Sequence, residues 1–166
     1  MGQGYGFKCS LCGKKNMALW GHGFSFPQVY KELLGKIKTG EYGEKWKDLS
    51  LKEKNVAVDA ERHVYLCKKC GYWSVEPGLS LYVPNDVKTL KKQQYGDSNV
   101  EDLGERPYVT SWDLKNNYHV LKNKIHKCAK CGEKMHRATF HEIKNLRCLE
   151  CGGEPDINDQ GAIWWD

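Results

Sequence analysis

The eight cysteines of this 166-residue chain are the residues whose type and spacing could do chemistry. Two intervening residues let one tight turn bring two thiolates to about 2.3 Å from a single ion. A following glycine can adopt the positive φ that turns backbone N–H groups toward the sulfurs. All eight cysteines belong to C-x-x-C-G motifs, which we number as knuckles 1 to 4: residues 9–13, 67–71, 128–132 and 148–152. With no cysteine left over, the pattern predicts two four-cysteine metal sites.

The spacing of the knuckles suggests how they pair. Sixteen residues, 132–147, separate the cysteines of knuckles 3 and 4, within the range typical of a zinc site. This spacing predicts that these two knuckles share one ion. Knuckles 1 and 2 are separated by 54 residues, 13–66, and are expected by elimination to share the other ion. In the alternative pairing, an early knuckle meets a late one and the whole chain becomes one interlocked domain.

Residues 127–152 (KCAKCGEKMHRATFHEIKNLRCLECG) resemble the zinc ribbon family, in which two hairpin-borne C-x-x-C-G knuckles clamp one metal. The resemblance covers the whole motif there, with a strand-like segment 137–143 returning through Asn145 into knuckle 4. Over residues 8–71 the knuckles match but a long insert separates them. Zinc ribbons serve in several unrelated processes, so the family does not select a function. The resemblance implies metal ligation at the cysteines alone: Cys9, Cys12, Cys67, Cys70, Cys128, Cys131, Cys148 and Cys151.

The elements around the knuckles predict an α+β fold of two small zinc-ribbon-like β modules, the first with a helical insert between its knuckles. Apolar residues at helical spacing follow Pro27, with Ser25 at the cap position. The expected elements are helices over 27–38 and 41–54, strands over 55–66 and 72–83, and a hairpin of strands over 108–114 and 118–125. The first module spans residues 1–84, a linker spans 85–106, and the second module spans 107–166.

Metal is expected to be required for folding. Modules of this size bury little apolar surface, whereas structural zinc contributes on the order of 10 to 16 kcal/mol in small peptides. Two zinc ions are the expected cofactors. Iron is the alternative, because paired C-x-x-C-G knuckles also resemble rubredoxin, an iron electron carrier. His126 and His136 are further candidates, able to replace a cysteine or to donate to a sulfur.

The distribution of charged residues indicates which kind of macromolecule the protein is expected to bind. The formal charge of +5 falls to about +1 when two zinc tetrathiolates, each about −2, are included. A basic patch surrounds knuckle 3: Lys122, Lys124, Lys127, Lys130, Lys134 and Arg137. Beyond Arg147 the charged residues are all acidic: Glu150, Glu154, Asp156, Asp159 and Asp166. An ion shared by knuckles 3 and 4 would hold these acids beside the patch, so we expect a protein partner slightly more than a nucleic acid.

No phosphate loop, Ser/His/Asp set or paired-carboxylate motif is present in the sequence. Four complete knuckles would also leave no open coordination position for catalysis. No apolar stretch approaches the ~18 residues of a membrane helix, and residues 1–7 lack the pattern of a secretory signal. We therefore expect a cytoplasmic, non-enzymatic zinc protein that supports a macromolecular interaction surface. The alternatives are a nucleic-acid-binding regulator and a rubredoxin-like electron carrier.

Overall fold

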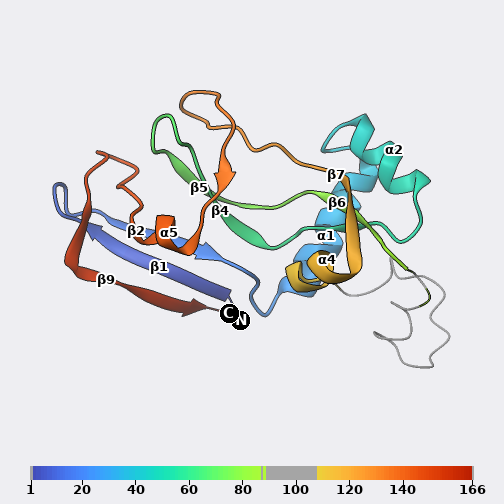
Figure 1. The fold of residues 1–166 in the computed structure, drawn as a ribbon, viewed down its shortest axis with the longest axis horizontal. Coiled ribbons are helices and arrows are strands. Elements are labelled where there is room, and N and C mark those ends of the chain that lie inside the picture. The colour runs from blue at the N-terminus through green and yellow to red at the C-terminus, as the bar shows by residue number, and fades with distance from the viewer. Residues whose placement is uncertain (1, 87, 89–107, 166) are drawn as a thin grey trace. The chain divides into compact units, whose positions relative to one another are not determined.

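A computed structural model of the chain describes residues 2–86, 88 and 108–165 (Figure 1). The linker predicted over residues 85–106 lies almost wholly outside the described residues. The chain forms two compact units, each assembled from separate segments. Unit 1 comprises Met1–Phe24, Arg62–Pro77 and Ile125–Asp166, and unit 2 comprises Ser25–Glu61 and Gly78–Lys124. The modules predicted over residues 1–84 and 107–166 each contribute to both units, because the chain leaves unit 1 after knuckle 1, returns for knuckle 2, and leaves it again before knuckle 3.

Among its described residues, 2–24, 62–77 and 125–165, unit 1 contains two three-stranded antiparallel sheets and one short helix, α5. The strand order is β2-β1-β9 in the first sheet and β5-β4-β8 in the second. The bounds are β1 Gly2–Cys9, β2 Lys15–Trp20, β9 Pro155–Trp165, β4 Arg62–Leu66, β5 Trp73–Pro77, β8 His136–Arg137 and α5 Phe140–Lys144. In Figure 1, β1 lies between β2 and β9, so the first and last strands of the chain are neighbours.

The two faces of β1 differ in side-chain size. Tyr5 and Phe7 point into the core of unit 1, where they pack with Val64, Trp73, Ile143 and Leu146. The opposite face carries glycines at positions 2, 4 and 6, and large side chains of the neighbouring strands lie over them. A Cβ atom on Gly4 would come within 2.4 Å of Leu19 Cδ2. Alternating glycine and aromatic residues therefore let β1 serve as the central strand between two bulky neighbours.

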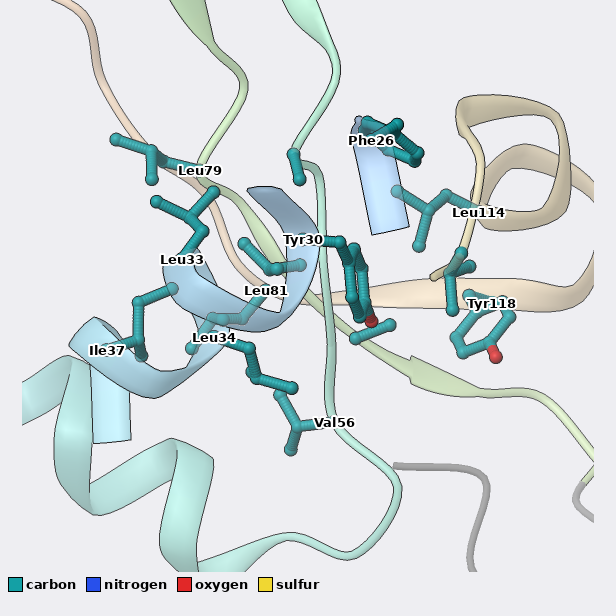
Figure 2. Close-up of a cluster of buried hydrophobic side chains, with 14 residues drawn as sticks. Phe26, Tyr30, Leu33, Leu34, Ile37, Val56, Leu79, Leu81, Leu114 and Tyr118 are labelled. Carbon is teal, nitrogen blue, oxygen red and sulfur yellow. The ribbon is translucent and has the colours of Figure 1, made fainter. Parts of the chain in front are cut away.

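Unit 2 contains three helices and one three-stranded antiparallel sheet among the described residues, in the order β3-β6-β7. Its core lies between helix α1 and this sheet (Figure 2). Tyr30, Leu33, Leu34 and Ile37 recur at helical spacing on α1 and are all buried there. The bounds are α1 Phe26–Thr39, α2 Glu44–Lys52, α4 Ser111–Asn117, β3 Ala57–Val58, β6 Leu81–Pro84 and β7 Tyr118–Lys122.

The structure confirms a mixed α+β fold, and it corrects two of the predicted strands. Residues 111–117 form helix α4 and not the first strand of a hairpin, while 137–143 becomes the end of β8 followed by helix α5. Both helices begin with a capping box, Thr110 with Asp113 and Thr139 with Glu142. Each threonine hydroxyl accepts from the backbone N–H three residues on, which stabilises the first turn and overrides the weak strand preference of the segment.

The two strands predicted around knuckle 2 each divide between the units. The segment 55–66 supplies β3 to unit 2 and β4 to unit 1, and the segment 72–83 supplies β5 to unit 1 and β6 to unit 2. The second division falls between Pro77 and Gly78. Among the described residues, no helix is both long enough and apolar enough to cross a bilayer.

We expect Ile37→Ala to destabilise the protein by about 2 to 5 kcal/mol, because it leaves a cavity at a fully buried site. Urea denaturation gives the free energy of unfolding. Val29→Ala on the same helix is the control, because Val29 is 43% exposed and its truncation should change stability by about 0.5 kcal/mol or less. Equal effects of the two substitutions would contradict the placement of the core.

Candidate metal centres

All four knuckles have the same backbone geometry. The glycine N–H donates to the carbonyl of the first cysteine of its motif at 2.8 to 3.0 Å in every knuckle. The four glycines, Gly13, Gly71, Gly132 and Gly152, have φ between +69° and +73°. This is the left-handed region that favours glycine, as the sequence pattern predicts. In each knuckle the first cysteine is buried and the second is more exposed.

The knuckles meet in two groups, each with four sulfurs within 4.8 Å of one another. Site 1 consists of Cys9, Cys12, Cys148 and Cys151, and site 2 consists of Cys67, Cys70, Cys128 and Cys131. The measured Sγ–Sγ distances between knuckles are 3.5 and 3.7 Å in site 1 and 3.5 to 3.6 Å in site 2. Tetrahedral zinc with ligands at about 2.3 Å requires about 3.8 Å between sulfurs, whereas a disulfide requires about 2.05 Å. Both groups could hold a metal ion.

This grouping corrects the pairing that the spacing predicted. Knuckle 1 meets knuckle 4, and knuckle 2 meets knuckle 3, so the pairs are nested along the chain. The sixteen residues between knuckles 3 and 4 do not form one hairpin, as they would in a plain ribbon. They include β8, which pairs with β4, and α5, whose Ile143 packs in the core of unit 1. This segment therefore carries the chain from site 2 to site 1. The alternative pairing, in which an early knuckle meets a late one, is the observed one, but the chain forms two compact units and not the single interlocked domain expected with it.

Strand pairing brings each pair of knuckles together. In site 1, β1 and β9 run side by side, and their register ends with Cys9 opposite Pro155. In site 2, β4 is the central strand: Leu66 lies opposite Trp73 on β5 and opposite His136 on β8. Cys67 follows Leu66 directly, Cys70 lies three residues before Trp73, and Cys131 lies five residues before His136. The sulfurs are thus positioned by sheet registers that only the folded chain reveals.

Asn16 is a positioning residue that the sequence analysis missed. Its Oδ1 accepts from the Leu149 backbone N–H of knuckle 4 at 3.2 Å, while its Nδ2 donates to the Lys14 carbonyl next to knuckle 1 at 3.2 Å. It therefore ties the two knuckles of site 1 together. Its only signal in the sequence is a polar residue shortly after a knuckle, which does not distinguish it from an ordinary surface asparagine.

The sulfurs of each group differ in how readily they ionise. The backbone N–H of Cys151 lowers the pKa of the Cys148 thiol to about 6, and the backbone N–H of Cys70 lowers the pKa of Cys67 to about 7. The backbone N–H of Lys14 also lowers the pKa of Cys12, but the neighbouring sulfurs and burial outweigh it and raise that pKa to about 12. Four thiolates this close repel one another, and a divalent cation at their centre would remove the repulsion.

Neither candidate histidine belongs to a sulfur group. His126 is buried, stacks on the Tyr65 ring at 3.7 Å between centroids, and contacts Glu76 through Nδ1 at 3.0 Å. His136 Nε2 lies 2.8 Å from a carboxylate oxygen of Glu142. The backbone N–H of Thr139 and then the His136 ring lower the pKa of Glu142 to about 2. Both imidazoles therefore act in packing and hydrogen bonding beside the sites.

The basic residues predicted around knuckle 3 divide between the two units. Lys127, Lys130, Lys134 and Arg137 lie in unit 1, whereas Lys122 and Lys124 lie in unit 2. Glu150 lies within knuckle 4, and Glu154, Asp156 and Asp159 follow it, so these acids belong with site 1 and β9 and not with the ion-binding group of knuckle 3. Knuckles 3 and 4 therefore share no ion-binding group, contrary to the expected pairing, although Lys130 of the patch donates to the Leu149 carbonyl beside Glu150 at 3.3 Å.

No family model, curated protein or solved structure matches the chain. The two groups are compatible with zinc-ribbon-like sites in their sulfur spacing, although membership of that family is not shown. The function must therefore be inferred from the geometry of the sites and their surroundings.

Paired cysteine substitutions distinguish the nested pairing, knuckle 1 with 4 and 2 with 3, from the pairing of neighbours along the chain, knuckle 1 with 2 and 3 with 4. We call the latter the sequential pairing. Cys12→Ser with Cys151→Ser removes two ligands from site 1 alone, so the chain should retain one tightly bound metal ion. Cys12→Ser with Cys70→Ser damages both sites, so the chain should retain none. Elemental analysis after dialysis against a moderate chelator measures the metal per chain. Under the sequential pairing the two results would be exchanged.

The left-handed conformation of the knuckle glycines gives a test of knuckle geometry. Gly152 has φ of +73°, so Gly152→Ala should destabilise the metal-loaded protein by about 1 to 2 kcal/mol. Gly161→Ala in β9 is the control, because nothing lies within 4 Å of the added Cβ atom and its φ is not positive. We expect Gly161→Ala to be neutral or slightly stabilising in urea denaturation. A tolerated Gly152→Ala would contradict the knuckle conformation.

Proposed function

We propose that each four-cysteine group binds one zinc ion, and that the protein is a non-catalytic, two-zinc scaffold that presents a surface to another macromolecule. The observation that carries this proposal is the tetrahedral spacing of the sulfurs in both groups, 3.5 to 3.7 Å. Four thiolates complete the coordination shell of zinc, and a structural zinc site is closed in this way.

The burial of the ligands supports a structural role. One cysteine of every knuckle is 3% exposed or less. In site 2, Cys67 and Cys128 pack with Tyr65 and Met135 in a small cluster of their own. A catalytic zinc keeps a position open for water or substrate, which a complete set of four thiolates does not provide.

The nested pairing supports the view that the metals hold unit 1 together. Site 1 joins the β1–β2 hairpin to the segment that enters β9, and Cys12 and Cys148 are 136 positions apart in the sequence. Site 2 joins the β4–β5 hairpin to the segment that enters β8. Structural zinc contributes on the order of 10 to 16 kcal/mol, which equals or exceeds the total stability of most domains, about 5 to 15 kcal/mol.

Removal of the metal is therefore expected to unfold unit 1. A strong chelator should abolish the near-ultraviolet circular dichroism of Trp73, which is buried in that unit and donates to the Arg147 carbonyl at 2.8 Å. Added zinc should restore the signal at two ions per chain. A Trp73→Phe variant identifies the contribution of this residue to the spectrum. A chain that stays compact without bound ions would refute the proposal.

The colour and the elemental composition of the purified protein identify the metal. Sulfur-only tetrahedral sites also accept iron, which gives a red protein when oxidised, whereas the zinc protein is colourless. We expect elemental analysis of the purified protein to find two zinc ions. Two iron ions with a reversible potential would instead assign the chain to the electron carriers.

A further inference from the structure

We propose that the exposed lysines of knuckles 2 and 3 bind the phosphate backbone of a nucleic acid. The inference rests on the proposed function, because the ion of site 2 would hold these two knuckles together. The lysines come from segments about 60 residues apart and are brought together by the cysteine pairing. We call them the lysine rim: Lys68, Lys69, Lys127, Lys130 and Lys134.

The lysine rim has an excess of positive charge. The segments 66–73 and 127–134, which run from one residue before each knuckle to two residues after it, contain five lysines and one carboxylate, Glu133. Even with the charge of about −2 of a zinc tetrathiolate, a net charge of about +2 remains. The nested pairing thus brings together two basic knuckles, Cys-Lys-Lys-Cys and Cys-Ala-Lys-Cys.

Site 1 shows that this excess is not a general property of the knuckles. The equivalent segments there, 8–15 and 147–154, contain four basic and two acidic residues, so a zinc tetrathiolate leaves a net charge of about zero. Lys14 forms an ion pair with Glu150 at 2.9 Å, and Arg147 forms one with Glu154 at 3.2 Å. Balancing the thiolates therefore does not require five lysines.

Two lysines of the rim face each other at close range. Lys127 and Lys134 lie directly opposite in an antiparallel bridge at the base of knuckle 3. Like charges at such positions repel, and a bound anion would relieve the repulsion. Lys69 is paired with Glu133 at 3.1 Å, and Lys130 lies over the Tyr72 ring while donating to the Leu149 carbonyl. Among the described residues, no carboxylate lies within ion-pair distance of Lys68, Lys127 or Lys134.

The chemistry of the rim favours a nucleic acid over an acidic protein. Protein interfaces are depleted in lysine and have aromatic or aliphatic residues at their centre. The two segments of the rim carry no large exposed apolar side chain, whereas site 1 carries Leu11, which is 77% exposed. A closely spaced row of phosphates is neutralised by lysine ammonium groups with release of counterions. Such contacts position a nucleic acid without reading its sequence, so little sequence preference is expected.

The test is binding of the zinc-loaded full chain to a fluorescein-labelled 20-bp DNA duplex and to a 20-nucleotide RNA, followed by anisotropy over a range of salt concentrations. The triple variant Lys68→Gln, Lys127→Gln and Lys134→Gln should bind at least one of them about tenfold more weakly or worse at low salt. The slope of log K against log salt should decrease by about one for each lysine removed.

The matched control is Lys31→Gln, Lys38→Gln and Lys45→Gln, which removes the same charge from exposed positions on or near the helices α1 and α2 of unit 2. We expect its affinity to stay within about twofold of the parent. Failure of both probes to bind, or equal loss in both variants, would overturn the proposal. Binding to vesicles with 30% anionic lipid but to neither nucleic acid would also overturn it.

Metal analysis of the same samples separates the two proposals. A chain that contains two zinc ions but binds neither probe would overturn only the inference about the lysine rim. A chain that folds without zinc would overturn the proposed function, and any binding that it shows would then have another origin. Both triple variants should retain two zinc ions and the parent circular dichroism spectrum.

Discussion

The convergence of four sulfurs at each site is the constraint on which unit 1 depends. Sulfurs at 3.5 to 3.7 Å are too far apart for a disulfide and too close to be ionised together without a cation between them. The sheets supply the registers, and the left-handed glycines let each turn close on its ligands. The small apolar core around Tyr5 and Trp73 completes a unit that is otherwise rich in turns.

The local features could be predicted from the sequence, because each depends on a few adjacent residues. The positive φ of the knuckle glycines and the buried stripe of α1 both follow from local spacing. The pairing could not be predicted, since four equivalent motifs fit together in more than one way. The decisive information lies in long-range contacts, such as Cys9 opposite Pro155 and Leu66 opposite His136. The role of Asn16 could not be predicted for the same reason, because the Leu149 backbone N–H that it accepts from is distant in sequence.

The pairing also decides how the surface charge is distributed. A patch that includes knuckle 3 looks self-neutralised if its ion is shared with the acidic segment after Arg147. It becomes a concentrated basic rim when knuckle 3 is paired instead with knuckle 2, which carries Lys68 and Lys69. The capping boxes at Thr110 and Thr139 have a similar effect on local structure, because each one starts a helix in a segment that was expected to be a strand. In both cases a few residues determine a property of a larger region: its net charge in the first case, and its secondary structure in the second.

The nested order of the knuckles constrains how the chain can mature during synthesis. The partners of site 2 emerge from the ribosome before the last partner of site 1, so the inner ring closes first. Counted from the synthesis of Cys12, knuckle 1 waits for 136 further residues until Cys148 is made, roughly 7 to 30 s at typical elongation rates. During that interval Cys9 and Cys12 are present without the other two cysteines of site 1. Under the proposed function, the ion of site 1 would therefore be loaded late, after the residues of unit 2 have been synthesised.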